Sequence, residues 1–270
     1  MVFDVESQEI SALNENDLDS RRFPRTANYD LAWLTEGSFG ANPLWLAEWL
    51  CEDLDLKAGM RVLDLGCGRA KTSIFLAKEF QVEVCAVDLW IDADENARRV
   101  QEAGVEHLVT CLHAEANNLP FAFRHFDAAL AFDSIQYFGT DTLWLPYIIQ
   151  HLKTGGLLGF ASAGVVKEMH HPVPEHLKRF WVSDAWSLRT CDWWRDHWQR
   201  TGLVDVHFAE TMSDGWKWWL NWAEACDCPD WYLDTIEEDA GSNLCYIRAL
   251  ARRAESAVDL THNLRTGKRQ

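Results

Sequence analysis

The chain has 270 residues, a length typical of one large domain with insertions or of one domain plus a cap. Its 48% hydrophobic and 25% charged residues indicate an ordinary globular protein and exclude collagen-like, disordered and disulfide-stapled classes. Asp and Glu outnumber Lys and Arg by 42 to 25, and the resulting net charge of −17 repels nucleic-acid phosphates and anionic bilayers. We therefore expect neither a nucleic acid nor a membrane as a partner.

The N-terminal sequence and the cysteines indicate in which cellular compartment the protein is expected. The N-terminus carries acids in place of a basic region followed by an apolar run, and no window of about 18 uncharged apolar residues occurs. This pattern predicts a soluble, cytoplasmic protein whose 8 scattered cysteines are reduced and mostly buried. Cys226 and Cys228 have no second pair at metal-binding spacing, so no metal is expected. The sequence does not indicate an oligomeric state.

The first half of the chain alternates helices and strands. Residues 1–25 are polar and without clear period, which predicts a loose arm, and we assign residues 1–41 to an N-terminal arm or cap. A helix is expected from Asn42, the N-cap, and Pro43, the first helical position. Strands are then expected at 61–65, 82–87, 108–112, 126–132 and 157–161, and helices at 71–79, 92–103 and 140–152. This alternation predicts an α/β fold with a doubly wound parallel sheet.

Two segments interrupt the alternation in the second half. We expect insertions at 163–189 and 212–239, with a helix at 192–201 and a strand at 203–209 between them. A last strand at 244–250 completes a main domain of residues 42–253, and residues 254–270 form a polar tail.

Ten of the 15 tryptophans fall between residues 181 and 231, mostly in or beside these insertions. Three interpretations of this cluster stay open: the core of a cap, an aromatic wall around a substrate that could cage an ammonium, and an interfacial membrane contact. We expect both insertions to close over the ligand site and to form the acceptor pocket.

The turn after the first strand is the main candidate ligand site. Residues 64–70 read Asp-Leu-Gly-Cys-Gly-Arg-Ala, and ligands of open parallel sheets bind beyond the carboxyl ends of the strands near such a turn. Asp88, expected at a solvent-facing strand end, is placed to accept hydrogen bonds from two ribose hydroxyls. Lys71 replaces the last glycine of a dinucleotide fingerprint, and Asp64 would repel a pyrophosphate. A nucleoside joined to a cationic amino acid is therefore the favoured ligand.

These positions make the sequence similar to the class I S-adenosylmethionine-dependent methyltransferases, specifically the group that acts on small molecules. The first motif of that family, Asp-x-Gly-x-Gly-x-Gly, matches residues 64–70 with Ala70 in place of the last glycine. Residues 114–121 (Ala-Glu-Ala-Asn-Asn-Leu-Pro-Phe), 126–133 and 152–156 resemble its later motifs in the same order. The resemblance covers roughly residues 42–162 and leaves the Trp-rich region without a substrate signature.

The resemblance implies a seven-stranded, mostly parallel Rossmann-like sheet with cap insertions, S-adenosylmethionine as the cofactor and S-adenosylhomocysteine as the product. It implies that Asp88 holds the ribose, that Glu115 accepts from the adenine amino group and that the amide of Ala116 donates to the ring. The full set of expected cofactor-binding residues is Asp64, Gly66, Cys67, Gly68, Asp88, Leu89, Glu115, Ala116 and Phe132.

Methyl transfer from a sulfonium is a direct displacement, which needs an in-line nucleophile and a base if that nucleophile bears a proton. Candidate catalytic residues are Asp133 and Tyr137, which follow the fourth strand, and His170 and His171 in the first insertion. Asp133 could instead be a helix N-cap, and the histidines could lie on a surface loop.

The sequence thus predicts methyl transfer to a small-molecule acceptor, an amine or an aromatic compound, with the methylated atom (oxygen, nitrogen, sulfur or carbon) left open. Two alternatives are a lipid-modifying enzyme similar to the cyclopropane fatty acid synthases and a protein that binds S-adenosylmethionine without catalysis.

Overall fold

The computed structural model describes residues 21–38, 40–255 and 257. Most of the expected N-terminal loose arm and most of the polar tail therefore lie outside the described residues. In the described part of the chain, no helix is both long and apolar enough to span a bilayer.

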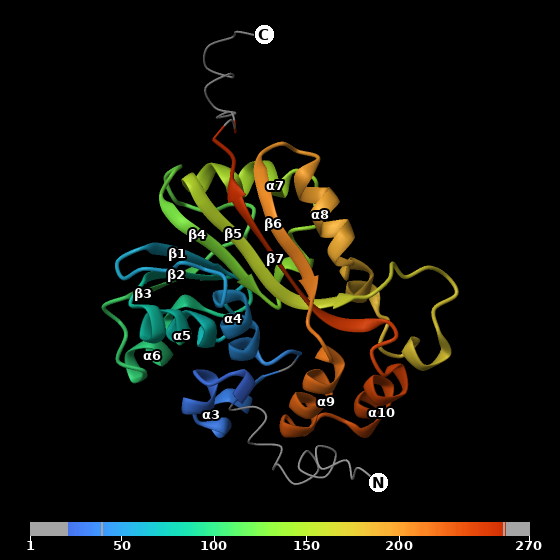
Figure 1. The fold of residues 1–270 in the computed structure, drawn as a ribbon. Helices are drawn as coiled ribbons and strands as arrows, with labels where there is room; N and C mark the ends of the chain where they lie inside the picture. Colours follow the sequence, from blue (N-terminus) through green and yellow to red (C-terminus); the bar gives the residue numbers. More distant parts are fainter. Residues whose placement is uncertain (1–20, 39, 256, 258–270) are drawn as a thin grey trace, which may run out of the picture.

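A seven-stranded sheet forms the centre of the molecule (Figure 1). Its strands are β1 (Arg61–Leu65), β2 (Glu83–Asp88), β3 (Val109–His113), β4 (Phe126–Phe132), β5 (Leu152–Val165), β6 (Val204–Thr211) and β7 (Leu244–Arg253). Their order is β3-β2-β1-β4-β5-β7-β6, with β1 to β5 parallel and β7 antiparallel to both of its neighbours. The seven-stranded, mostly parallel sheet expected from the sequence is confirmed. The chain leaves β1 toward β2 and returns to β4 on the other side, so a ligand crevice is expected at the carboxyl ends of β1 and β4.

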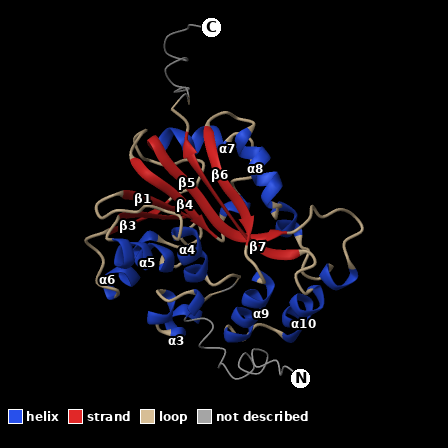
Figure 2. Ribbon diagram, in the orientation of Figure 1, coloured by secondary structure: helices blue, strands red, loops and turns tan. Residues whose placement is uncertain are grey.

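Helices cover both faces of the sheet (Figure 2). One face carries α4 (Pro43–Cys51), α5 (Lys71–Phe80) and α6 (Ala93–Glu102), and the other carries α7 (Trp144–Ile148) and α8 (Cys191–Gln199). A hydrophobic core lies on each face of the sheet, and successive residues of β1 point into opposite cores. Val62 belongs to the cluster under α4 and α5, whereas Leu63 belongs to the cluster under α7 and α8. The strands are therefore buried on both sides, as in other parallel sheets.

The helix expected at 140–152 is much shorter in the structure. Only Trp144–Ile148 is α-helical, followed by a 3-10 turn at Ile149–His151, and β5 already begins at Leu152. Pro146 lies in the first turn of α7, the place where a residue without an N–H group is tolerated, so the helix cannot begin as early as residue 140.

The described part of the N-terminal segment is packed, and it includes residues 21–25 of the loose arm expected at residues 1–25; for the rest of that arm the expectation stays a prediction. It contains a 3-10 turn (Thr26–Asn28) and α3 (Leu31–Thr35), and Phe23 is fully buried with its ring 5.5 Å from that of Trp45. The buried carboxylate of Glu48 accepts from the amides of Arg25 and Thr26, both at 2.8 Å. Contacts made by single residues, such as Phe23 and Glu48, do not produce a periodic pattern in the sequence, so the sequence did not indicate this packing.

The two insertions pack against each other beside the end of the sheet from which β7 starts (Figure 1). The second insertion contains α9 (Gly215–Ala225) and α10 (Asp230–Asp239), and the first contains 3-10 turns at Glu175–Leu177 and Ser183–Ser187. The ring of Phe180 lies 6.0 Å from Trp219 and 5.9 Å from Tyr232. His176 Nε2 lies 3.0 Å from the buried Asp239 Oδ1, which joins the two insertions by a polar contact as well.

Candidate active site

The glycine turn after β1 depends on left-handed backbone and on a close contact with the end of β4. Gly66, Gly68 and Ala70 all have positive φ, at 67°, 52° and 59°. A Cβ on Gly66 would lie 2.5 Å from the Cβ of Ser134, so no larger residue fits there. Ala70 is buried and adopts the same left-handed conformation without being glycine.

Asp88 ties the end of β2 to this turn. Its Oδ2 accepts from the amide of Gly68 at 2.8 Å, and its Oδ1 accepts from the amides of Trp90 and Ile91 at 2.7 and 2.9 Å. The residue is 7% exposed, so the expectation of a solvent-facing strand end is wrong. A carboxylate offers about four acceptor positions, and the three bonds leave capacity for a ribose hydroxyl. That role of Asp88 stays a prediction.

Asp64 lies in the interior behind the turn and is fully buried. The hydroxyls of Thr72 and Ser73 each donate to its Oδ2 at 2.6 Å, whereas Oδ1 has no hydrogen-bond partner among the described residues. Burial raises the pKa of Asp64 from 3.8 to about 6. An unpaired buried carboxylate oxygen is costly, and a cationic group brought to it would relieve that cost.

The expected adenine site lies beyond β3. Glu115 is exposed and Ala116 is partly exposed, while the amide of Ala114 donates to the carbonyl of Asp88 at 3.0 Å and so joins this segment to the end of β2. Leu89 is 47% exposed, a position open to a ligand. Phe132 and Cys67 are buried, and burial raises the pKa of the Cys67 thiol. The contacts thus bring most of the predicted cofactor residues to one edge of the sheet, but their binding roles stay predictions.

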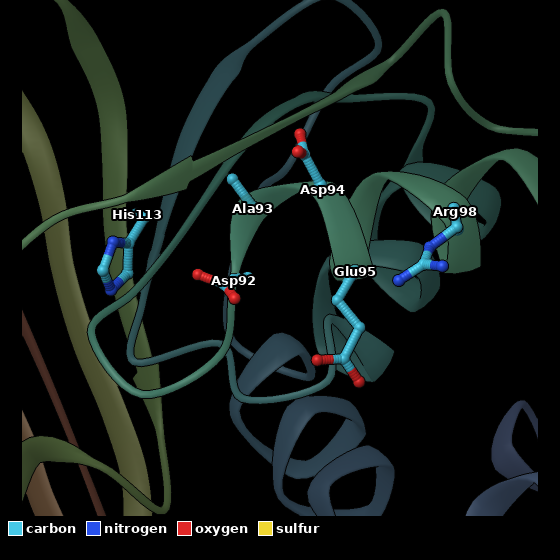
Figure 3. A pocket seen from close by; sticks show the side chains of 6 residues that line it. All are labelled: Asp92, Ala93, Asp94, Glu95, Arg98 and His113. Atoms are coloured by element: carbon cyan, nitrogen blue, oxygen red, sulfur yellow. The ribbon is translucent and has the colours of Figure 1, made fainter.

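A pocket opens next to this edge, between the start of α6 and the end of β3 (Figure 3). It is lined by Asp92, Ala93, Asp94, Glu95, Arg98 and His113. His113 is in register with Asp88, so the pocket adjoins the expected ribose position. Three carboxylates against one guanidinium disfavour a pyrophosphate nearby, in agreement with the preference for a nucleoside without phosphates.

Asp133 follows β4 with a positive φ of 50° and has both carboxylate oxygens engaged. Its Oδ2 accepts from the amide of Ala41 at 3.1 Å, and its Oδ1 accepts from the amide of Ala163 at 3.2 Å and from the hydroxyl of Ser162 at 3.4 Å. The helix N-cap interpretation is wrong, because the 3-10 turn that follows (Ile135–Tyr137) has Ser134 at that position. Burial raises the pKa of Asp133, which suits a proton acceptor, and its role as a base stays a prediction.

The other candidate catalytic residues lie nearer the surface. Tyr137 is 50% exposed and packs edge-on against Trp90, with ring centroids 5.0 Å apart. His170 and His171 are both exposed, and the ring of His171 lies 4.6 Å from that of Trp186 within the first insertion. Catalytic roles for these three residues stay predictions.

Sequence reasoning did not foresee what Lys71 does. Its ammonium is almost completely buried and donates to the carbonyls of Leu34 and Glu36 and to the hydroxyl of Ser38, at 2.6, 2.8 and 2.7 Å. Burial lowers its pKa from 10.5 to about 8. Lys71 and Asp133 therefore hold the chain around residues 34–41 beside the glycine turn.

The tryptophans divide between two environments. Trp194 and Trp198 of α8 fill the core under that helix, next to Phe160. Trp219 of α9 instead stacks on Tyr246 of β7, with centroids 5.1 Å apart and planes 11° apart. Core filling thus accounts for the α8 pair, and Trp219, which is also buried in a core cluster, packs at the carboxyl edge of the parallel strands.

A comparison with protein families matches residues 62–156 to a methyltransferase domain. The chain is 31% identical over 128 residues to the O-methyltransferase resE of Aspergillus sclerotiorum, which covers 47% of this chain and 48% of that protein. It is 33% identical over 118 residues to methyltransferase GfsG of Streptomyces halstedii, covering 43% and 42% of the two chains. Residues 62–156 thus resemble a methyltransferase domain, and the match concerns this part of the chain. The chain spans about half the length of the curated relatives it matches.

Solved structures show that the methyltransferase fold extends beyond the matched residues. Phosphoethanolamine N-methyltransferase 2 of Haemonchus contortus has a TM-score of 0.66 at 20% identity, covering 90% of this chain and 61% of that one. Geranyl diphosphate C-methyltransferase of Streptomyces coelicolor A3(2) has a TM-score of 0.64 at 18% identity, covering 77% and 76%. At 18–20% sequence identity, these two similarities show a shared fold and nothing further.

Proposed function

We propose that this protein transfers the methyl group of S-adenosylmethionine to a hydroxyl oxygen of a small-molecule acceptor. The observation that carries the proposal is the buried, unpartnered Oδ1 of Asp64 behind the glycine turn, since it matches the ammonium of an amino acid joined to a nucleoside. The cofactor supplies the electrophilic methyl group, and the protein's part is to bind, to orient and to exclude water.

The cofactor roles follow the residues described above. Asp64 would favour the amino group, Asp88 the ribose, and Glu115 with the amide of Ala116 the adenine. Leu89 offers apolar surface at the same edge. Neutral nucleoside and cationic amino-acid groups suit a site whose neighbouring pocket carries three carboxylates.

The names of the relatives favour oxygen as the methylated atom. Besides resE, they include an O-methyltransferase of Pyrenophora dematioidea, 33% identical over 105 residues. A cyclopropane-fatty-acyl-phospholipid synthase of Escherichia coli is also similar, at 28% identity over 153 residues. We nevertheless propose a small molecule as the acceptor, because a protein with a net charge of −17 is repelled by the anionic bilayer in which a phospholipid substrate would lie.

Thermal unfolding with and without nucleosides tests cofactor binding. At a hundredfold excess over its dissociation constant, S-adenosylhomocysteine should add ~2.7 kcal/mol, which corresponds to a rise in Tm of roughly 5–10 °C for a chain of this size. NAD at the same concentration serves as the control and should give no rise. A rise with NAD and none with S-adenosylhomocysteine would overturn the assignment.

A second measurement separates the proposed acceptor class from a lipid. Vesicles of unsaturated phosphatidylglycerol, added to the protein with S-adenosylmethionine, should form no S-adenosylhomocysteine above the acceptor-free rate. Lipid-dependent product formation would contradict the small-molecule proposal and support the cyclopropane-synthase alternative.

A further inference from the structure

Tyr246 occupies a position at the proposed active site that no motif indicated. It lies opposite Ala163 in the antiparallel pairing of β5 and β7. The amide of Ala163 donates to Asp133, so Tyr246 belongs to the same edge of the sheet as that carboxylate. The position is therefore next to the end of β4, where an acceptor would meet the cofactor.

Tyr246 contacts an aromatic cluster to which both insertions contribute side chains. Its ring stacks on Trp219, whose indole Nε1 donates to the hydroxyl of Tyr232 at 2.9 Å. Phe180 of the first insertion packs against both Trp219 and Tyr232. These contacts hold the phenol ring of Tyr246 in one orientation.

The hydroxyl of Tyr246 is the unusual feature of this cluster. The residue is 1% exposed, and among the described residues its hydroxyl has no hydrogen-bond partner, whereas that of Tyr232 has one. Leaving a buried hydroxyl unpaired is unfavourable, and a phenylalanine would fill the same space without this cost. Burial also raises the pKa of Tyr246 far above its ordinary value, so the group is a permanent donor.

We propose that Tyr246 is an acceptor-binding residue that donates a hydrogen bond to an oxygen of the acceptor, and that the acceptor is an oxygen-bearing aromatic compound whose ring packs beside the cluster of Trp219, Phe180 and Tyr232. This inference rests on the proposed function and specifies its substrate class.

The hydroxyl of Tyr246 favours an acceptor oxygen over an ammonium. A phenol that stays protonated donates a hydrogen bond, and an ammonium has no lone pair to accept it. The oxygens of Asp133, which lies at the same edge of the sheet, already accept from three donors. An acceptor oxygen, in contrast, gains the hydrogen bond that Tyr246 lacks.

The experiment compares two probes of nearly equal shape, phenol and toluene, on the full chain saturated with S-adenosylhomocysteine. Saturable binding of each is measured by calorimetry for the wild-type protein and for Tyr246→Phe. The preference for phenol over toluene should fall by about threefold to tenfold in the variant, as expected for one lost hydrogen bond, with toluene binding unchanged. Tyr147→Phe is the matched control, because the Tyr147 hydroxyl accepts from the amide of Leu119, away from the insertions.

An unchanged preference in Tyr246→Phe, an equal loss in Tyr147→Phe, or no saturable phenol binding to the wild-type protein would each overturn the inference. Failure of S-adenosylhomocysteine to bind is a separate result that overturns the proposed function. The same two-probe comparison on the free protein then still tests the role of Tyr246.

Discussion

At the scale of single residues, the candidate site combines buried charges with incomplete hydrogen bonding. Asp64 has one oxygen bonded to two hydroxyls and one without a partner among the described residues. Its pKa of about 6 exceeds the ordinary value because burial disfavours the carboxylate. The free protein should therefore lose stability as the pH rises from about 4 to 6, where the folded state holds a proton more tightly than the unfolded state does.

Binding of the cofactor should show the opposite dependence, because an ammonium favours the ionised form of Asp64. We expect the affinity for S-adenosylhomocysteine to rise about tenfold from pH 5 to pH 7. In Asp64→Asn this rise should disappear, since the amide does not ionise. Calorimetric titrations at several pH values measure both proteins, and an identical pH profile would show that Asp64 does not face the amino group.

We expect Asp88 to contribute both to the stability of the fold and to binding of the cofactor. Asp88→Ala removes the acceptor of the Gly68, Trp90 and Ile91 amides, so we expect a loss of about 2–4 kcal/mol in the free energy of unfolding together with weaker binding of S-adenosylhomocysteine. Urea unfolding and calorimetry separate the two effects. In Asp88→Asn the side-chain oxygen still accepts from Trp90 and Ile91, so this variant should keep more stability while losing affinity. If folded Asp88→Asn bound S-adenosylhomocysteine as tightly as the wild-type protein, Asp88 would not be the residue that holds the ribose.

At the scale of elements, the start of α5 has two tasks. Its first residues follow the glycine turn, and its Lys71 anchors the end of α3 and the residues after it through three hydrogen bonds. Because α3 is only five residues long, it depends on such tertiary contacts for its stability. The N-terminal segment is therefore held in place by the helix that begins at the ligand site.

Lys71→Met should release this segment. We expect faster proteolysis between residues 21 and 41. We also expect S-adenosylhomocysteine to dissociate about tenfold faster, which corresponds to a loss of roughly 1.4 kcal/mol of binding free energy. In the wild-type protein the dissociation rate should also increase as the pH rises through about 8, where Lys71 loses its charge. Lys78→Met, at an exposed position of the same helix, is the control. Equal proteolysis and dissociation in both variants would mean that the anchor does not restrain the cofactor.

At the scale of the whole molecule, three segments far apart in the sequence meet at one edge of the sheet. The N-terminal segment reaches Asp133 through Ala41, the 3-10 turn at Ser183–Ser187 contacts the one at Ile135–Tyr137, and α9 reaches the N-terminal segment where Trp218 packs on Phe23. Figure 1 shows α3, α9 and α10 together below the sheet. This arrangement agrees with the expectation that the insertions cover the ligand site, and their role as a lid stays a prediction.

Hydrogen exchange tests this lid. Binding of S-adenosylhomocysteine should slow amide exchange not only in residues 66–70 but also in residues 34–38, 176–185 and 215–225, because closure of the edge would stabilise all of these segments. The amides of α8, which covers the other face of the sheet, are the control and should change little. Protection confined to the glycine turn would contradict a lid made of the insertions.

The sequence by itself determined the class of fold, the position of the glycine turn and the residues at the strand ends. Strand β4 spans Phe126–Phe132 as expected, and Asp64 and Asp88 lie where their motifs indicate, because turns and alternating apolar runs are encoded by neighbouring residues. Only the tertiary structure decided what those residues touch. The bonds of Asp133 to Ala41 and Ala163 join residues that are 92 and 30 positions apart, and the stacking of Tyr246 on Trp219 joins residues 27 positions apart. Such contacts arise from the packing of completed elements, for which local periodicity carries no signal.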